Sequence, residues 1–111
     1  MSKIIDLLKQ YREGAEGTGN PVSKKANTSH DQMHVAYKQL RECSDGKVGI
    51  VALMADENPH VKCWAAAHSL AWEPDKARAV LEELRDFRGA CSFDAEMVLE
   101  QFDAGKLTFE Y

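Results

Sequence analysis

Long hydrophobic runs are absent from this sequence. Its apolar stretches span only a handful of residues, whereas a membrane-spanning helix needs roughly 20. The N-terminal segment Ser2–Asp6 also lacks the apolar core of a signal peptide. We therefore expect no contact with a membrane and, by default, a cytoplasmic location.

Cysteine is scarce in the chain. Cys43, Cys63 and Cys91 are an odd number, lie far apart and include no CxxC pair. This spacing argues against a disulfide framework and against a zinc–thiolate site. We expect free, buried thiols, and we expect neither a metal nor a cofactor.

An excess of positive charge is missing as well. The 111 residues include 14 Lys and Arg against 18 Asp and Glu, a net charge of −4. Residues 1–50 carry a net charge of +2, and residues 51–111 carry −6. Because nucleic-acid binding depends on neutralising phosphates with Lys and Arg, we expect no nucleic-acid partner. A basic protein surface is the better match to an acidic half.

The composition that is present is typical of a folded globular protein. Hydrophobic residues make up 44% of the chain and charged residues 29%, which indicates neither disorder nor a fibrous structure. At this length we expect residues 1–111 to form one domain with a single core.

Apolar residues recur every three or four positions, which is the period of an α-helix. The clearest stretch is Gly46–Leu84, where turns at Asp56–Pro59 and Glu73–Asp75 separate three short helices. Asn58 is placed to cap the second of these helices, with Pro59 at its first position. Three further helices are predicted at Ser2–Glu13, from Pro21 or Ser23 to Glu42, and from Ser92 or Asp94 to a cap at Gly105.

The remaining segments are predicted connections. The glycine-rich run Gly14–Pro21 is expected to stop the first helix and to connect it to the next. A phosphate-binding loop is not expected, because no strand precedes the run and no Gly-Lys-Ser/Thr motif follows it. The tail Leu107–Tyr111 alternates apolar and polar residues, and we expect it to lie extended over the core.

Six helices joined by short connections are expected to pack as antiparallel pairs. The pairs are weakly alike, since Leu40 and Leu70 stand 30 residues apart and Val61 and Phe93 stand 32 apart. Recurrence at 30 to 45 residues is typical of stacked helical hairpins, each of which needs a neighbour to cover its apolar face. The predicted fold is therefore all-α, an α-α superhelix of about three hairpins.

The segments Asp56–Lys62 and Trp64–Leu70 resemble the signature of HEAT repeats: an acid and an Asn-Pro turn, then Val-Lys, then small residues where helices touch. The resemblance implies that Asp56 and Lys62 tie neighbouring repeats together, and Trp64 is likewise expected to be structural. Residues 46–107 as a whole are similar to a small bacterial HEAT-like family, domain of unknown function 2019, and the first 45 residues much less so. Members of that family often resemble immunity proteins that neutralise a toxin, which implies a protein partner and no catalysis.

Two groups of residues raise the alternative of an enzyme. His30 and His34 stand at i and i+4 on one helix, the spacing that binds zinc in HExxH proteases. The acid between them is Asp31, one methylene shorter than Glu, and no third ligand is evident; a small metal-dependent hydrolase is the alternative hypothesis. His60 and Cys63 share a helix, yet no orienting third group or oxyanion donor accompanies them.

The hypothesis that we favour is a non-catalytic binding module that docks an acidic surface on a basic protein partner, such as a cognate toxin. A generic helical-repeat scaffold is the other alternative. Trp72 lies beside acids at a turn, where it either anchors a partner or closes the core between two hairpins. The predicted partner-binding residues are Asp56, Glu57, Trp72, Glu73, Asp75, Glu82, Glu83 and Asp86.

Overall fold

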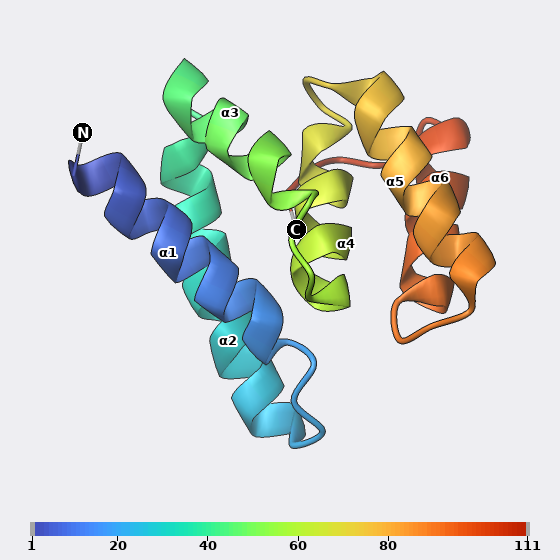
Figure 1. Cartoon of the computed structure of the whole chain (residues 1–111), viewed down its shortest axis with the longest axis horizontal. Helices are drawn as coiled ribbons and strands as arrows, with labels where there is room; N and C mark the ends of the chain where they lie inside the picture. The colour runs from blue at the N-terminus through green and yellow to red at the C-terminus, as the bar shows by residue number, and fades with distance from the viewer. Residues whose placement is uncertain (1, 111) are drawn as a thin grey trace.

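The computed structural model describes residues 2–110, which form six α-helices joined by short turns (Figure 1). The helices are α1 (Ser2–Gly17), α2 (Ser23–Leu40), α3 (Ser44–Leu53), α4 (Pro59–Ser69), α5 (Pro74–Phe87) and α6 (Ser92–Asp103). No β-strand occurs in this part of the chain. The prediction of an all-α fold with six helices is confirmed.

Helix α4 lies at the centre of the molecule and packs against α1, α3, α5 and α6 (Figure 1). Seven of its eleven residues are buried, including the consecutive Ala65, Ala66 and Ala67. Alanine has the smallest side chain that still favours a helix, so neighbouring helices approach α4 closely on more than one side. Each helix also packs against the next one along the chain.

Two helix ends follow the predicted chemistry. The Asn58 side chain accepts hydrogen bonds from the backbone N–H groups of His60 (2.9 Å) and Val61 (3.3 Å), and Pro59 begins α4. These are two of the donors that a helix N-terminus leaves without partners. Gly105 follows α6 with a φ of +70°, the left-handed conformation that glycine adopts most readily.

The first helix is longer than predicted. The glycine-rich run was expected to stop it at Glu13, but α1 continues to Gly17. A Cβ atom on Gly14 would lie 2.6 Å from both the Met33 nitrogen and the Ser29 oxygen of α2. Gly14 is therefore a point of close backbone contact between α1 and α2, which lie side by side and run in opposite directions (Figure 1).

The C-terminal tail runs back from α6 to the centre of the molecule (Figure 1). Leu107 and Phe109 pack against the core, and the Tyr37 hydroxyl of α2 donates a hydrogen bond to the Phe109 carbonyl at 2.9 Å. The predicted contact of the tail with the core is confirmed at Leu107 and Phe109; Tyr111 lies outside the described residues. In residues 2–110, no helix combines the length and the apolar character required to cross a membrane.

Candidate functional site

The negative charge of the molecule is concentrated on the α5–α6 hairpin. Between positions 73 and 105 the chain has nine acidic and four basic residues, a net charge of −5, against +1 for the rest of the chain. This hairpin forms one end of the molecule, away from α1 and α2 (Figure 1). The fold therefore gathers onto one end the acidic charge that the sequence distributes along positions 73–105.

Two of the four basic residues on the hairpin are held by its own acids. Arg78 forms an ion pair with Asp103 at 2.6 Å and a longer one with Glu82 at 3.6 Å, and Arg85 pairs with Asp86 at 2.9 Å. The guanidinium of Arg78 donates two hydrogen bonds to Asp103 and thereby lowers the pKa of that carboxyl. The pairs leave several carboxylates facing solvent without a described ion pair.

The predicted partner-binding acids fall into three environments. Asp75, Glu83 and Asp86 are exposed on the outward side of α5, and Glu57 is exposed in the turn before α4. Glu73 and Glu82 are half-buried. Of these six, only Glu82 and Asp86 are in described ion pairs.

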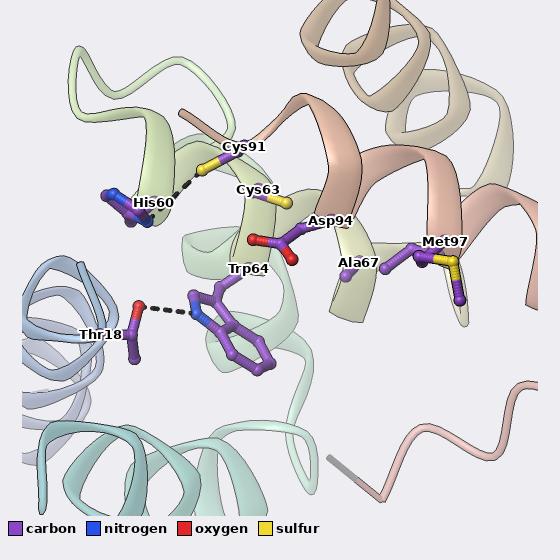
Figure 2. A pocket seen from close by; sticks show the side chains of 9 residues that line it. Thr18, His60, Cys63, Trp64, Ala67, Cys91, Asp94 and Met97 are labelled. Carbon is purple, nitrogen blue, oxygen red and sulfur yellow. Dashed lines mark hydrogen bonds between the residues drawn. The ribbon is translucent and has the colours of Figure 1, made fainter. Parts of the chain in front are cut away.

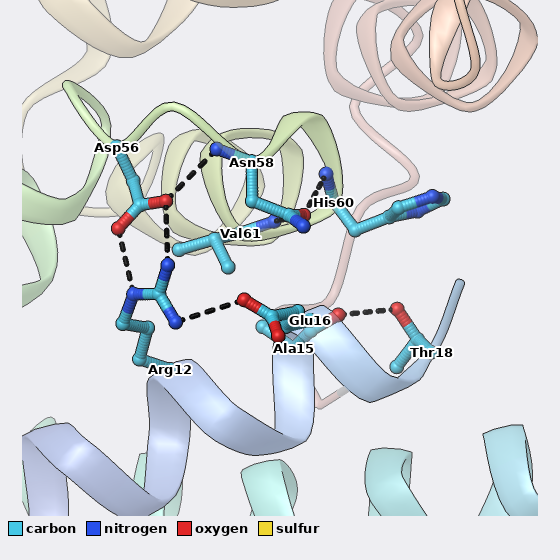
Figure 3. Close-up of polar contacts among 8 residues, drawn as sticks. All are labelled: Arg12, Ala15, Glu16, Thr18, Asp56, Asn58, His60 and Val61. Atoms are coloured by element: carbon cyan, nitrogen blue, oxygen red, sulfur yellow. Dashed lines mark hydrogen bonds and ion pairs between the residues drawn. The ribbon is translucent and has the colours of Figure 1, made fainter. Parts of the chain in front are cut away.

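Asp56, the seventh predicted partner-binding acid, forms an ion pair with Arg12 of the same chain. Its carboxylate accepts hydrogen bonds from Arg12 Nε at 2.8 Å and Arg12 Nη2 at 3.2 Å, and its side chain is 14% exposed (Figure 3). Its Oδ1 atom also accepts from the Asn58 backbone N–H at 2.9 Å. The hydrogen bonds from Arg12 lower the pKa of Asp56. The resemblance implied that Asp56 and Lys62 tie neighbouring repeats together; the described ion pair of Asp56 joins the turn before α4 to Arg12 of α1.

Two large aromatic side chains are exposed at the tip of the same hairpin. Phe87 ends α5 and is 81% exposed, and Phe93 begins α6 and is 70% exposed. Between them, Arg88 adopts a left-handed φ of 59° and turns the chain. Exposed phenylalanines next to carboxylates are the mixture of apolar and charged groups that protein interfaces use.

Trp72 lies away from this tip and is half-buried. Its ring stacks against Tyr37 with centroids 6.5 Å apart, and the Lys47 ammonium lies 5.7 Å from its centroid. The indole Nε1 is buried without a hydrogen-bond partner among the described residues. These contacts correspond to the core-closing alternative considered for Trp72.

A row of aromatic rings joins α2 to α4. His68 is fully buried, stacks on Tyr37 with centroids 3.7 Å apart, and shares a 2.6 Å hydrogen bond with the Tyr11 hydroxyl. Trp64 is half-buried and donates to the Thr18 hydroxyl at 3.0 Å. Trp64 and His68 therefore connect the central helix to α1 and α2.

His30 and His34 lie on one face of α2, as their spacing requires. Their rings are nearly parallel, with centroids 5.8 Å apart and an interplanar angle of 12°, and His30 packs against Trp64. The lone pair with which an imidazole nitrogen binds a metal lies in the plane of its ring. Because the two rings are stacked in nearly parallel planes, their lone pairs do not point at one shared metal position. In the described part of the chain, no group of three or more His, Cys, Asp and Glu side chains is arranged to hold a metal ion.

A cavity of about 340 Å³ opens between α4 and α6, near the end of α1 (Figure 2). It is lined by Thr18, His60, Cys63, Trp64, Ala67, Cys91, Asp94, Met97 and Val98. The Cys91 sulfur lies 3.4 Å from His60 Nδ1. The interaction of the two thiols, together with burial, raises the pKa of Cys63, and the interaction with Cys63 lowers the pKa of Cys91.

The contact between His60 and Cys91 was not predicted from the sequence. His60 was considered only with Cys63, because those two residues share a helix. Cys91 is 31 residues away, at the N-cap of α6, and only the packing of α6 on α4 brings it to His60. No periodicity within one helix could have shown this contact.

Comparisons of the chain with protein-family models, with curated proteins and with solved structures found no match. The resemblance to HEAT repeats and to the small bacterial family stays a prediction.

Proposed function

We propose that this protein is a non-catalytic, HEAT-like binding module whose α5–α6 hairpin docks on a basic surface of a protein partner. The observation that carries the proposal is the charge distribution: the hairpin has a net charge of −5, and the remainder of the chain is nearly neutral. A concentrated charge of one sign steers a partner of the opposite sign and speeds its capture.

The outward side of α5 supplies the charged part of the proposed surface. Asp75, Glu83 and Asp86 are exposed there, and the apolar residues of the helix, Ala77 and Leu81, are buried against the core. A partner can therefore contact these carboxylates without disturbing the packing of α5.

Phe87 and Phe93 supply the apolar part. Their exposed rings stand at the tip of the hairpin, and aromatic side chains are enriched at protein interfaces, where they bury a large apolar area. Charge alone provides rate and orientation, whereas aromatic anchors slow dissociation.

The superhelical arrangement is part of the proposal. Sequential packing of α1 through α6, with an alanine-rich central helix, is what stacked helical hairpins require. In such a stack the two end hairpins each have one uncovered side, and the α5–α6 hairpin is one of those ends.

More specifically, we propose that this binding module is an immunity protein that binds and neutralises a toxin. Its support is the resemblance of Asp56–Lys62 and Trp64–Leu70 to the HEAT-like family described above. A toxin that acts on an anionic substrate has a basic active site, and carboxylates placed near it would occupy the position of the substrate.

The test measures binding to the product of the neighbouring gene, purified separately and titrated by calorimetry. The double substitution Glu83→Lys and Asp86→Lys should weaken binding by about tenfold or more, because like charges then face each other across the contact. It should leave the circular dichroism spectrum unchanged, since both residues are exposed.

The matched control is Asp6→Lys with Glu13→Lys, two exposed acids of α1 at the other end of the molecule. It changes the net charge by the same amount and should leave affinity within about twofold, because screening limits the reach of surface charge. Equal weakening by both pairs would contradict the assignment of the hairpin. Absence of binding to the unsubstituted chain would contradict the immunity role.

A further inference from the structure

The cavity between α4 and α6 is lined by two thiols and an imidazole. Cys91 Sγ lies 3.4 Å from His60 Nδ1, and its residue is only 2% exposed (Figure 2). Cys63 lines the same cavity and is also buried. Three residues from two helices thus converge on one wall of a cavity.

This arrangement differs from that of the third cysteine. Cys43 is half-buried at the start of α3, where its sulfur accepts a hydrogen bond from the Gly46 backbone N–H at 3.4 Å. No histidine contact and no second thiol are described for it. Cys43 therefore serves as an internal comparison thiol in the same folded chain, outside the cavity.

The neighbours of Cys91 favour its thiolate. The neighbouring Cys63 thiol lowers the pKa of Cys91, against the opposing effects of burial and of the Asp94 carboxylate. The imidazole of His60 is placed to accept the proton that Cys91 releases. The thiolate is the form of cysteine that reacts with oxidants and electrophiles.

We propose that Cys91 is a modification site for small peroxides, with His60 as the proton acceptor and Cys63 as the resolving thiol. The small size of the oxidant follows from burial: the Cys91 sulfur is reached through the cavity and is nearly closed to bulk solvent. Hydrogen peroxide is small enough to enter a space of about 340 Å³.

The chemistry occurs in two steps. In the first, the Cys91 thiolate attacks one oxygen of hydrogen peroxide, the O–O bond breaks, and sulfur loses two electrons to become a sulfenic acid. The departing hydroxide takes the proton held by His60 and leaves as water.

In the second step, the Cys63 sulfur attacks the sulfenic sulfur of Cys91. The S–S bond forms, the S–O bond breaks, and the hydroxide leaves as water with the proton from Cys63. Two thiols and one peroxide thereby give one disulfide and two waters. The disulfide would join the middle of α4 to the N-cap of α6.

The experiment exposes the folded, full-length chain to hydrogen peroxide, stops the reaction with acid, and alkylates the remaining thiols after denaturation. Peptide mass spectrometry should find a Cys63–Cys91 disulfide while Cys43 stays alkylated. Cys91 should be consumed about tenfold faster than Cys43, because an imidazole is described beside the Cys91 sulfur and none beside Cys43. This comparison needs no variant and cannot fail through misfolding.

Three variants assign the roles. Cys63→Ser should leave Cys91 as a sulfenic acid that dimedone traps after unfolding, and Cys91→Ser should leave Cys63 reduced. His60→Gln should slow the loss of Cys91 severalfold without slowing that of Cys43. Preferential oxidation of Cys43, or tight binding of zinc that leaves both cavity thiols unreactive, would overturn the proposal.

Discussion

Asp56 performs two structural roles in one side chain. It accepts two hydrogen bonds from Arg12, 44 positions earlier in the chain, and a third from the backbone of Asn58 (Figure 3). It therefore fixes the turn that begins α4 and connects this turn to α1. The acid and the Asn-Pro turn were visible in the sequence, but the choice of Arg12 as partner depends on how α1 packs.

The pairing makes the stability of the protein depend on pH. Asp56 has its pKa lowered below 3.8 in the folded state by Arg12, so its stabilising contribution is present above that pH and is lost as the pH falls. We expect Asp56→Asn to lower the melting temperature at pH 7. This difference should shrink as the pH falls below 3.8, because the wild-type carboxyl then becomes neutral too.

The control is Glu57→Gln, an exposed acid next to Asp56 that forms no described ion pair. It should leave the melting temperature unchanged at neutral pH. A difference between Asp56→Asn and the wild type that is the same at pH 7 and at low pH would show that the charge of Asp56 does not act through Arg12.

At the scale of helices, most of the fold was predictable, and the exception was α1. Periodicity located all six helices, and local chemistry located the caps at Asn58 and Gly105. Gly14 misled the prediction because glycine has two uses: it ends helices, and it lets two backbones approach. A single sequence does not distinguish these uses, since the second depends on another helix.

The close approach at Gly14 predicts the effect of adding one methyl group. Gly14→Ala gains about 1 kcal/mol of helix propensity. The new Cβ would meet backbone atoms of Ser29 and Met33, which cannot rotate away, and overpacking typically costs about 1–3 kcal/mol. We therefore expect a net loss in the free energy of unfolding, measured with urea.

Gly49 of α3 provides the matched control. A Cβ there would meet only the end of the Leu8 side chain, which can change rotamer at small cost. Gly49→Ala should therefore be nearly neutral or slightly stabilising. A stability for Gly14→Ala equal to or above that of the wild type would contradict the close contact of α1 with α2.

At the scale of the whole molecule, the α1–α2 end and the α5–α6 end differ in the side chains that they leave exposed. The α1–α2 end is held by contacts with the rest of the fold, including the Tyr37 hydrogen bond to the tail. The α5–α6 end exposes Phe87, Phe93 and unpaired carboxylates. The excess of acids in the second half was evident from the sequence. The exposure of the phenylalanines was not, because Phe93 entered the prediction only through its spacing from Val61 and Phe87 was assigned no role.

The most direct test of the docking surface is an NMR titration of the isotope-labelled chain with the product of the neighbouring gene. The largest amide shift changes should fall on α5 and the hairpin tip, at Asp75, Glu83, Asp86, Phe87 and Phe93. They should decrease as salt is added, because the attraction is electrostatic. Shift changes concentrated on α1 and α2, with the hairpin unchanged, would contradict the proposal.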